Sequence, residues 1–212
     1  MVLTVDVISD VICPWCYIGK RRLEKAVAAL DGQHEVRVHW LPFQLNPAMP
    51  KEGISRREYR TRKFGSWERS LALDATVIEV GQEEGIRFAF DRIERTPNTL
   101  DAHRLIALAE KLGVQDAVVE ALFRAYFTEG RDISNRQTLL DVVAEAGLDR
   151  SKADALLNGD GGLEAFQEAD QRTRRHPVEG VPCFVLNGKF TLSGAQPPEA
   201  ILEACRQALA AV

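Results

Sequence analysis

A Cys-x-x-Cys pair, Cys13 and Cys16, stands where an apolar strand pattern passes directly into a helical one. The strand pattern runs from Leu3 to Ser9, and the helical pattern begins at Pro14 and continues to about residue 30. Proline suits the first position of a helix because no N–H donor is needed there and its φ angle is already helical. The sequence therefore predicts that Cys13 caps the N-terminus of this helix.

This position favours a reactive thiol. Backbone N–H groups without partners and the positive end of the helix dipole stabilise a thiolate there over the thiol. Cys16 lies one turn further on, near enough to form a disulfide, and shares the apolar face of the helix with Leu23 and Leu30. We therefore expect Cys13 to be exposed and to attack a substrate disulfide, and Cys16 to be covered and to resolve the mixed disulfide.

Zinc binding and a purely structural disulfide account for the pair less well. A Cys-x-x-Cys can be half of a zinc site, but Cys183 and Cys205 are far apart and no histidine stands near them at a finger-like spacing, so we expect no metal. A structural disulfide closing so short a loop would remove little entropy from the unfolded chain. A redox site is the remaining interpretation.

Composition sets limits on the partners. The chain has 212 residues, 45% of them hydrophobic, which is enough for one large domain or a domain with an insertion. A net charge of −4 gives no basic field for nucleic acid, and no apolar run approaches the length of a membrane span. No secretory signal is visible at the N-terminus. We expect a cytoplasmic protein with no nucleic-acid or membrane partner.

The order of the elements indicates a sheet interrupted by helices. Residues 35–40 alternate as a second strand, which with the first strand and helix makes a parallel βαβ unit. From about Ser55 to His176 the apolar period is helical, apart from a short strand-like run at 86–90. Strand character returns at 180–186, Asn187-Gly188 predicts a hairpin to residues 189–192, and prolines at 197 and 198 open a last helix.

Three basic residues and one acid near the pair can each be interpreted in two ways. Lys20, Arg21 and Arg22 are expected on a solvated outer face, although they could attract an anionic partner such as glutathione. Asp6, on the first strand, is expected at an edge or facing solvent rather than acting as a proton acceptor for Cys16.

This order of elements, with Cys-x-x-Cys after the first strand and Val181-Pro182 before the third, resembles the thioredoxin fold with the helical insertion of DsbA-like proteins. The segments SDVICPWCYIGKRRLE, NTLDAHRLIALAE and EGVPCFVLNGKFTLSGAQPPE resemble the FrnE-type branch, which is related to 2-hydroxychromene-2-carboxylate isomerases and kappa-class glutathione transferases. The expected class is α/β: residues 1–45 and 177–212 form a discontinuous thioredoxin-like domain, and 46–176 a helical insertion domain.

The resemblance implies roles at matching positions. Cys13 would be the nucleophile, Cys16 the resolving thiol, and Pro182 a cis-proline beside them, with the Val181 backbone pairing with an extended substrate. A peptide bond before proline adopts the cis form at small cost. Because proline has no N–H group, the loop offers no donor that would compete for the substrate thiolate. Pro14 would support the site and Trp15 would contact substrate. The alternative for Pro182 is a trans proline at the start of an edge strand.

The expected activity is thiol–disulfide exchange with protein or small-thiol substrates, with no cofactor unless glutathione serves as co-substrate. The Pro-Trp dipeptide between the cysteines adds no charge, so we expect a weaker oxidant than the strongly oxidising proteins of this superfamily. The sequence does not predict whether the protein oxidises or reduces its substrates. The alternatives are a glutathione-dependent isomerase or transferase of a small aromatic substrate, and a non-catalytic module using the groove around Trp15. The related isomerases and transferases generally have Ser at the nucleophile position. The complete Cys pair of this chain does not match that pattern. Asn98 and His103 could line a small-molecule pocket, but a helix cap and a packed ring are expected.

The other two cysteines are predicted to be buried free thiols. Strand alternation puts Cys183 on the face opposite Pro182, and Cys205 falls on the apolar stripe of the last helix. The alternative is a second, regulatory pair that exchanges electrons with Cys13 and Cys16.

Overall fold

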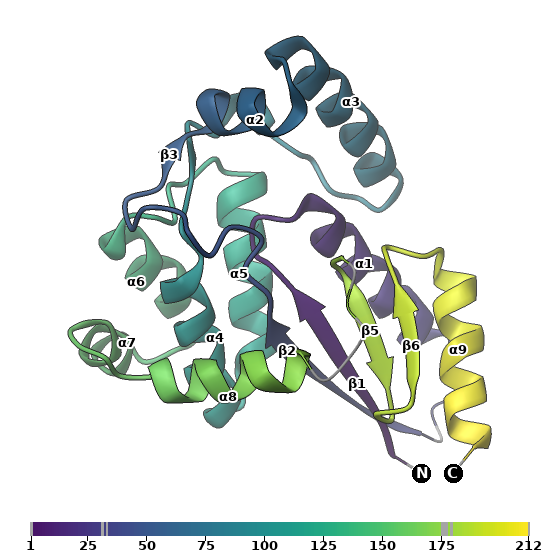
Figure 1. Ribbon diagram of the computed structural model, residues 1–212. Helices are drawn as coiled ribbons and strands as arrows, with labels where there is room; N and C mark the ends of the chain where they lie inside the picture. Colours follow the sequence, from purple (N-terminus) through teal and green to yellow (C-terminus); the bar gives the residue numbers. More distant parts are fainter. Residues whose placement is uncertain (1, 31, 33, 175–177, 179, 212) are drawn as a thin grey trace.

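The computed structural model describes residues 2–30, 32, 34–174, 178 and 180–211 (Figure 1). The elements on either side of the long insertion are β1 (Val2–Ser9), α1 (Pro14–Ala28), β2 (Glu35–Pro42), β5 (Cys183–Leu186), β6 (Phe190–Ser193) and α9 (Pro198–Ala210). The elements between β2 and β5 are β3 (Ile54–Ser55), α2 (Arg56–Phe64), α3 (Trp67–Glu83), β4 (Arg95–Thr96), α4 (Leu100–Lys111), α5 (Gln115–Phe127), α6 (Arg136–Glu145), α7 (Arg150–Leu157) and α8 (Leu163–Arg174).

The main sheet has the strand order β2-β1-β5-β6. β1 runs parallel to β2, with Val5 opposite Val38, and antiparallel to β5. The turn between β5 and β6 uses positive φ angles at Asn187 (48°) and Gly188 (68°), as the Asn-Gly signal predicts. The predicted α/β thioredoxin fold with a large helical insertion is confirmed.

Strand β1 lies inside the sheet, and one of its faces is buried throughout, whereas the other is buried at Ile8 and half-buried at Thr4 and Asp6. Val5 and Val7 point into the main core with α1 and α9, whereas Ile8 lies on the other face beside Cys183 and Leu41. Helices α1 and α9 pack against each other, and α4, α5 and α8 contact β2. The insertion therefore packs along the β2 side of the sheet, while α2 and α3 lie above the N-terminal end of α1 (Figure 1).

The prediction of a short strand at residues 86–90 is wrong. Phe90 begins a short 3-10 turn, and Phe88 and Phe90 stack on each other at 4.9 Å in an aromatic cluster with Phe127. Their alternation therefore reflects packing in this cluster. The strand pair within the insertion is instead β3 with β4, whose strands have two residues each and are too short for a sequence period. The domain boundaries near 45 and 177 stay a prediction, and residues 176 and 177 lie outside the described residues.

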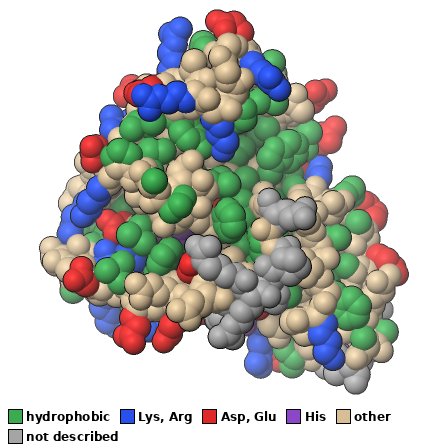
Figure 2. Space-filling model, in the orientation of Figure 1, with side chains coloured by type: hydrophobic (Ala, Val, Ile, Leu, Met, Phe, Trp, Pro, Cys, Tyr) green, Lys and Arg blue, Asp and Glu red, His purple; other side chains and the backbone are tan. Residues whose placement is uncertain are grey.

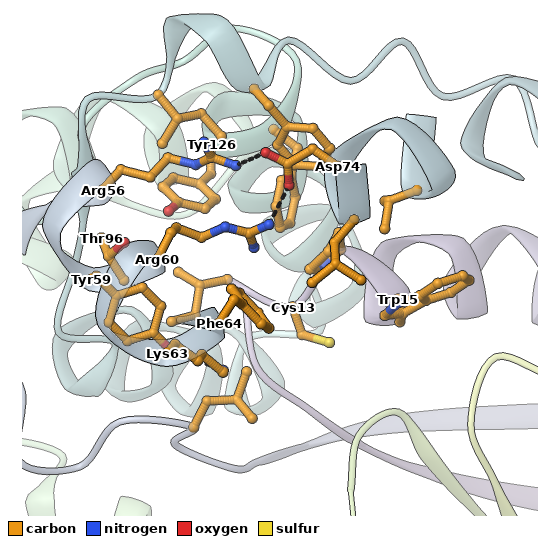
Figure 3. Close-up of a pocket in the computed structure, with 18 of the residues that line it drawn as sticks. Cys13, Trp15, Arg56, Tyr59, Arg60, Lys63, Phe64, Asp74, Thr96 and Tyr126 are labelled. Atoms are coloured by element: carbon orange, nitrogen blue, oxygen red, sulfur yellow. Dashed lines mark hydrogen bonds and ion pairs between the residues drawn. The ribbon is translucent and has the colours of Figure 1, made fainter. Parts of the chain in front are cut away.

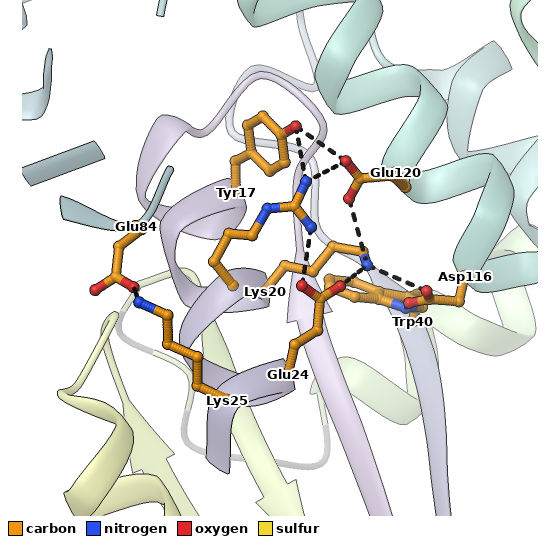
Figure 4. Close-up of polar contacts among 9 residues, drawn as sticks. Tyr17, Lys20, Glu24, Lys25, Trp40, Glu84, Asp116 and Glu120 are labelled. Carbon is orange, nitrogen blue, oxygen red and sulfur yellow. Dashed lines mark hydrogen bonds and ion pairs between the residues drawn. The ribbon is translucent and has the colours of Figure 1, made fainter. Parts of the chain in front are cut away.

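The prediction of a solvated basic face on α1 is wrong. Lys20 is 2% exposed and its ammonium group pairs with Glu24, Asp116 and Glu120 (Figure 4). Arg21 also pairs with Glu120, and Arg22 binds Glu84 at 2.6 Å. Burial alone would lower the pKa of Lys20, but these carboxylates raise it. The basic residues tie α1 to α5 and to the end of α3, so they are not a free anion-binding surface.

Among the described residues, none of the helices combines the length and the apolar character that crossing a lipid bilayer requires.

Candidate functional site

Cys13 is the N-cap residue of α1, as the sequence predicts. Its backbone is extended (φ −94°, ψ 111°), its amide donates to the Asp10 carbonyl at 3.0 Å, and Pro14 occupies the first turn. The Cys16 amide donates to the Cys13 carbonyl at 3.0 Å, which places the second cysteine one turn into the helix. The two thiol side chains lie 3.5 Å apart.

The two thiols have opposite pKa shifts. The pKa of Cys13 is lowered, first because its sulfur accepts a hydrogen bond from the Cys16 thiol, and also because it faces the backbone N–H groups of Cys16 and Trp15. Burial and the hydrogen bond to Cys13 raise the pKa of Cys16 well above its ordinary value. Cys13 is therefore the thiol that loses its proton first, and Cys16 stays protonated to higher pH.

The prediction that Cys13 is exposed is wrong, whereas Cys16 is covered as predicted. Cys13 is 6% exposed and Cys16 is 0% exposed. Helices α2 and α3 overhang the N-terminus of α1, so Cys13 shares a pocket with Phe64 and Val77 instead of facing open solvent. Helix periodicity predicts which side chains share a face, but it does not reveal a distant part of the chain that covers this face. Trp15, at 37% exposure, is the residue of the motif that faces solvent.

The loop before β5 completes the site. The Val181–Pro182 bond is cis, and in its protonated form Cys13 donates a hydrogen bond to the Val181 carbonyl, with sulfur and oxygen 3.6 Å apart. Pro182 itself is buried, and its carbonyl accepts from the Gly194 amide at 2.8 Å. A Cβ atom on Gly19 of α1 would come within 2.9 Å of the Pro182 ring. Gly19 therefore permits the close approach of this loop to α1.

Sequence reasoning missed a buried acid beside the pair. Asp10 is 0% exposed, and its carboxylate accepts from the Leu45 amide at 2.8 Å. Its second oxygen lies 3.4 Å from Nε2 of His103, which is 4% exposed. The negative charge of Asp10 acts to raise the pKa of Cys13, against the hydrogen bonds that lower it. The only signal in the sequence was an acid three residues before Cys13 in an otherwise apolar stretch.

A cavity of about 330 Å³ opens beside Cys13 (Figure 3). Its walls come from the start of α1, from α2 and α3, from residues 90–96 that follow α3, and from the end of α5. Asn98 and His103, which could have lined a small-molecule pocket, are not among its lining residues. The Asn98 side chain accepts from the Leu100 amide at 2.9 Å, as expected near a helix start, and His103 is packed beside Asp10.

The remaining cysteines are buried free thiols, as predicted. Cys183 is 1% exposed on the second face of the sheet, and Cys205 is 0% exposed on α9. Burial alone raises the pKa of Cys183, and it raises the pKa of Cys205 to about 11.

Comparison with known proteins identifies the family. The model of the DSBA-like thioredoxin domain matches residues 4–206, so the chain belongs to this family. A probable DsbA oxidoreductase from Streptomyces coelicolor has a similar structure, with a TM-score of 0.90, 31% identity, and coverage of 98% of this chain and 90% of that one.

More distant structures share the fold. The cytosolic disulfide reductase DsbM from Pseudomonas aeruginosa superposes with a TM-score of 0.67 at 22% identity, covering 99% of this chain and 100% of that one. A 2-hydroxychromene-2-carboxylate isomerase superposes with a TM-score of 0.68 at 21% identity, covering 99% of both chains. The fold therefore occurs in proteins named for two different reactions.

Proposed function

We propose that this protein is a thiol–disulfide oxidoreductase whose redox centre is the Cys13–Cys16 pair. The observation that carries the proposal is the asymmetry of two adjacent thiols, one with a lowered and one with a raised pKa, at a helix N-terminus. Attack on a disulfide requires a thiolate, and resolution requires a second thiol within bonding reach. Membership of the DSBA-like family supports the same activity.

The proposed reaction has two exchange steps. The Cys13 thiolate attacks one sulfur of a substrate disulfide, and the other substrate sulfur leaves as a thiolate that takes up a proton. Cys16 then loses its proton and attacks the Cys13 sulfur, which releases the second substrate thiol and leaves a Cys13–Cys16 disulfide. Run in reverse, the same steps oxidise a substrate dithiol.

Neighbouring residues have supporting roles in this proposal. Pro14 starts the helix that stabilises the thiolate, and Pro182 places a backbone without an N–H donor beside the sulfurs. The Val181 backbone and the exposed Trp15 ring are positioned to contact a substrate next to Cys13.

Glutathione is the proposed thiol that recycles the disulfide, and the proposed setting is the reducing cytoplasm. The structural neighbour DsbM is named a cytosolic disulfide reductase, and its structure has also been solved with GSH. The isomerase alternative has less support, because the Cys pair is complete and the two polar residues considered for an aromatic substrate lie outside the pocket beside Cys13.

The proposal is tested by exchange activity and by redox potential. Purified protein should catalyse the reduction of insulin by glutathione or the refolding of scrambled ribonuclease, and should form one Cys13–Cys16 disulfide in oxidised glutathione buffers. A reduction potential of about −270 mV would favour a reductase, and a potential of about −120 mV would favour an oxidase. Absence of exchange in both assays would contradict the proposal.

A further inference from the structure

We propose that the pocket beside Cys13 selects small apolar disulfides or thiols that carry an acidic group, with the acid bound at Arg60 and the sulfur at Cys13. This inference rests on the proposed exchange activity and names the substrate class of the same site. It depends on the volume, the walls and the charge of the pocket.

The size and walls of the pocket suit a small organic molecule. Its volume of about 330 Å³ lies at the lower end of the range for ligand sites, roughly 300–1,000 Å³. Leu45, Phe90 and Ile93 supply apolar walls. Figure 2 shows apolar side chains gathered beneath α2 and α3 on this face, with basic side chains along the upper edge.

The charge of the pocket is positive although the protein is negative overall. Arg56, Arg60 and Lys63 line it, and Asp74 is the one acidic side chain among its lining residues. Arg56 and Arg60 share this carboxylate, at 2.7 and 2.5 Å. The lining therefore holds three cations against one anion, a surplus that an acidic ligand would neutralise.

Arg60 is the best-placed cation. Its side chain crosses the middle of the pocket between Arg56 and Cys13 (Figure 3). Nε donates to the Ser70 hydroxyl at 2.7 Å and Nη2 donates to Asp74, whereas Nη1 has no acceptor among the described residues. Burial lowers the pKa of the Arg60 guanidinium, the Asp74 carboxylate opposes this shift, and the nearby positive charge of Arg56 adds to it.

Both arginines lie over aromatic rings, and the Arg60 guanidinium is 4.6 Å from the centre of the Phe64 ring. Arg56 is the more deeply buried of the two, with 5% of its side chain exposed against 15% for Arg60. Arg56 is 4% exposed, and its guanidinium lies over the Phe90 and Trp67 rings at 5.1 and 5.8 Å. With Asp74 on one side and these rings around it, Arg56 serves to hold the carboxylate in place. This leaves Arg60 to face the pocket.

The redox step follows the balance given above. Cys13 and Cys16 together lose two electrons and form their disulfide, while the bound disulfide gains two electrons and leaves as two thiols. An acid paired with Arg60 increases the time that the substrate sulfur spends beside Cys13.

The test compares two aromatic disulfides that release coloured thiols. Dithiobis(nitrobenzoate) carries a carboxylate on each ring, whereas dithiodipyridine is neutral. With the reduced full-length protein, Arg60→Gln should slow the reaction with the anionic disulfide by roughly tenfold and leave the neutral one nearly unchanged, as expected for the loss of one charged hydrogen-bonded contact. Arg60→Lys should keep most of the anionic rate.

Arg62→Gln is the matched control. Arg62 lies on the same helix with a 73% exposed side chain, pairs with Glu58 and does not line the pocket, so this change removes the same charge elsewhere. It should leave the ratio of the two rates unchanged. Because both probes react with the same thiols, a folding defect would change both rates together and would not imitate a change in their ratio.

Three results would overturn the inference while leaving the exchange activity intact. The first is an Arg60→Gln variant with an unchanged ratio of rates, and the second is an equal change of that ratio in Arg62→Gln. The third is a slowing of insulin reduction by Arg60→Gln equal to that of the anionic probe, which would assign the pocket to protein segments. Failure of the wild-type protein to react with either probe would instead contradict the proposed function.

Discussion

All four cysteines of this protein are buried, but the surroundings of Cys13 and Cys16 differ from those of Cys183 and Cys205. Cys13 and Cys16 lie side by side at the start of α1, where one sulfur receives hydrogen bonds from the other thiol and from backbone N–H groups. Cys183 and Cys205 lie among apolar side chains, and burial alone sets the direction of their pKa shifts. Exposure therefore does not separate the proposed redox thiol from a packing thiol here. Hydrogen-bond donors to the thiolate do.

The largest expected effect is the loss of exchange in Cys13→Ser. This change removes the only thiol with a lowered pKa, so the insulin reduction rate should fall to the uncatalysed level. Cys16→Ser should still attack and should accumulate mixed disulfides, visible by non-reducing electrophoresis and mass spectrometry. Capture of substrates by Cys16 in the Cys13→Ser variant would reverse the assigned roles.

Substitution of the other two cysteines, Cys183 and Cys205, should lower stability and leave the exchange activity unchanged. Cys205→Ser places a hydroxyl in an apolar core position and should lower the free energy of unfolding by about 1–3 kcal/mol, measured by urea denaturation. Its exchange rate should stay at the wild-type level below the unfolding transition. Oxidised wild-type protein should contain two free thiols after denaturation. Zero free thiols in monomeric protein would establish a second disulfide and remove the contrast.

Gly19→Ala tests the packing that holds the Pro182 loop against the pair. The new methyl group would overlap the proline ring, so we expect a loss of roughly 1–2 kcal/mol in stability after the gain in helix propensity, together with slower exchange. Gly32→Ala is the control, because nothing lies within 4 Å of the added atom. Equal stability of the two variants would show that the loop adapts freely.

Asp10→Asn should produce a smaller, directional change. The Asp10 charge raises the pKa of Cys13, so its removal should lower that pKa further and move the pH of half-maximal alkylation of Cys13 downward. The amide oxygen can still accept from the Leu45 amide, so the backbone contact is preserved. Asp6→Asn, on the adjoining strand β1, is the control. An upward move in Asp10→Asn would contradict this electrostatic assignment.

Much of this contrast could be predicted from the sequence, because it depends on local patterns. The N-cap position of Cys13, the burial of Cys16 and the burial of Cys183 and Cys205 all follow from helix and strand periodicity. The hairpin at Asn187 follows from turn chemistry. These properties need only the neighbours along the chain.

The two wrong predictions about exposure, and one contact that no pattern predicted, concern segments that are distant along the chain. Cys13 is covered because α2 and α3 fold over it, and Lys20 is buried because Asp116 and Glu120 approach from α5. Arg60 and Asp74 meet across two helices with no periodic signal to pair them. A single sequence contains these residues but does not say which of them meet.

The most direct test of the account is the pH dependence of alkylation at all four cysteines, measured in one reduced sample by mass spectrometry. We expect Cys13 to react first, with a pKa below the ordinary thiol value, and Cys16, Cys183 and Cys205 to react only at higher pH. A Cys13 thiol that titrates with or above Cys183 and Cys205 would contradict the central claim that its hydrogen-bond donors outweigh its burial.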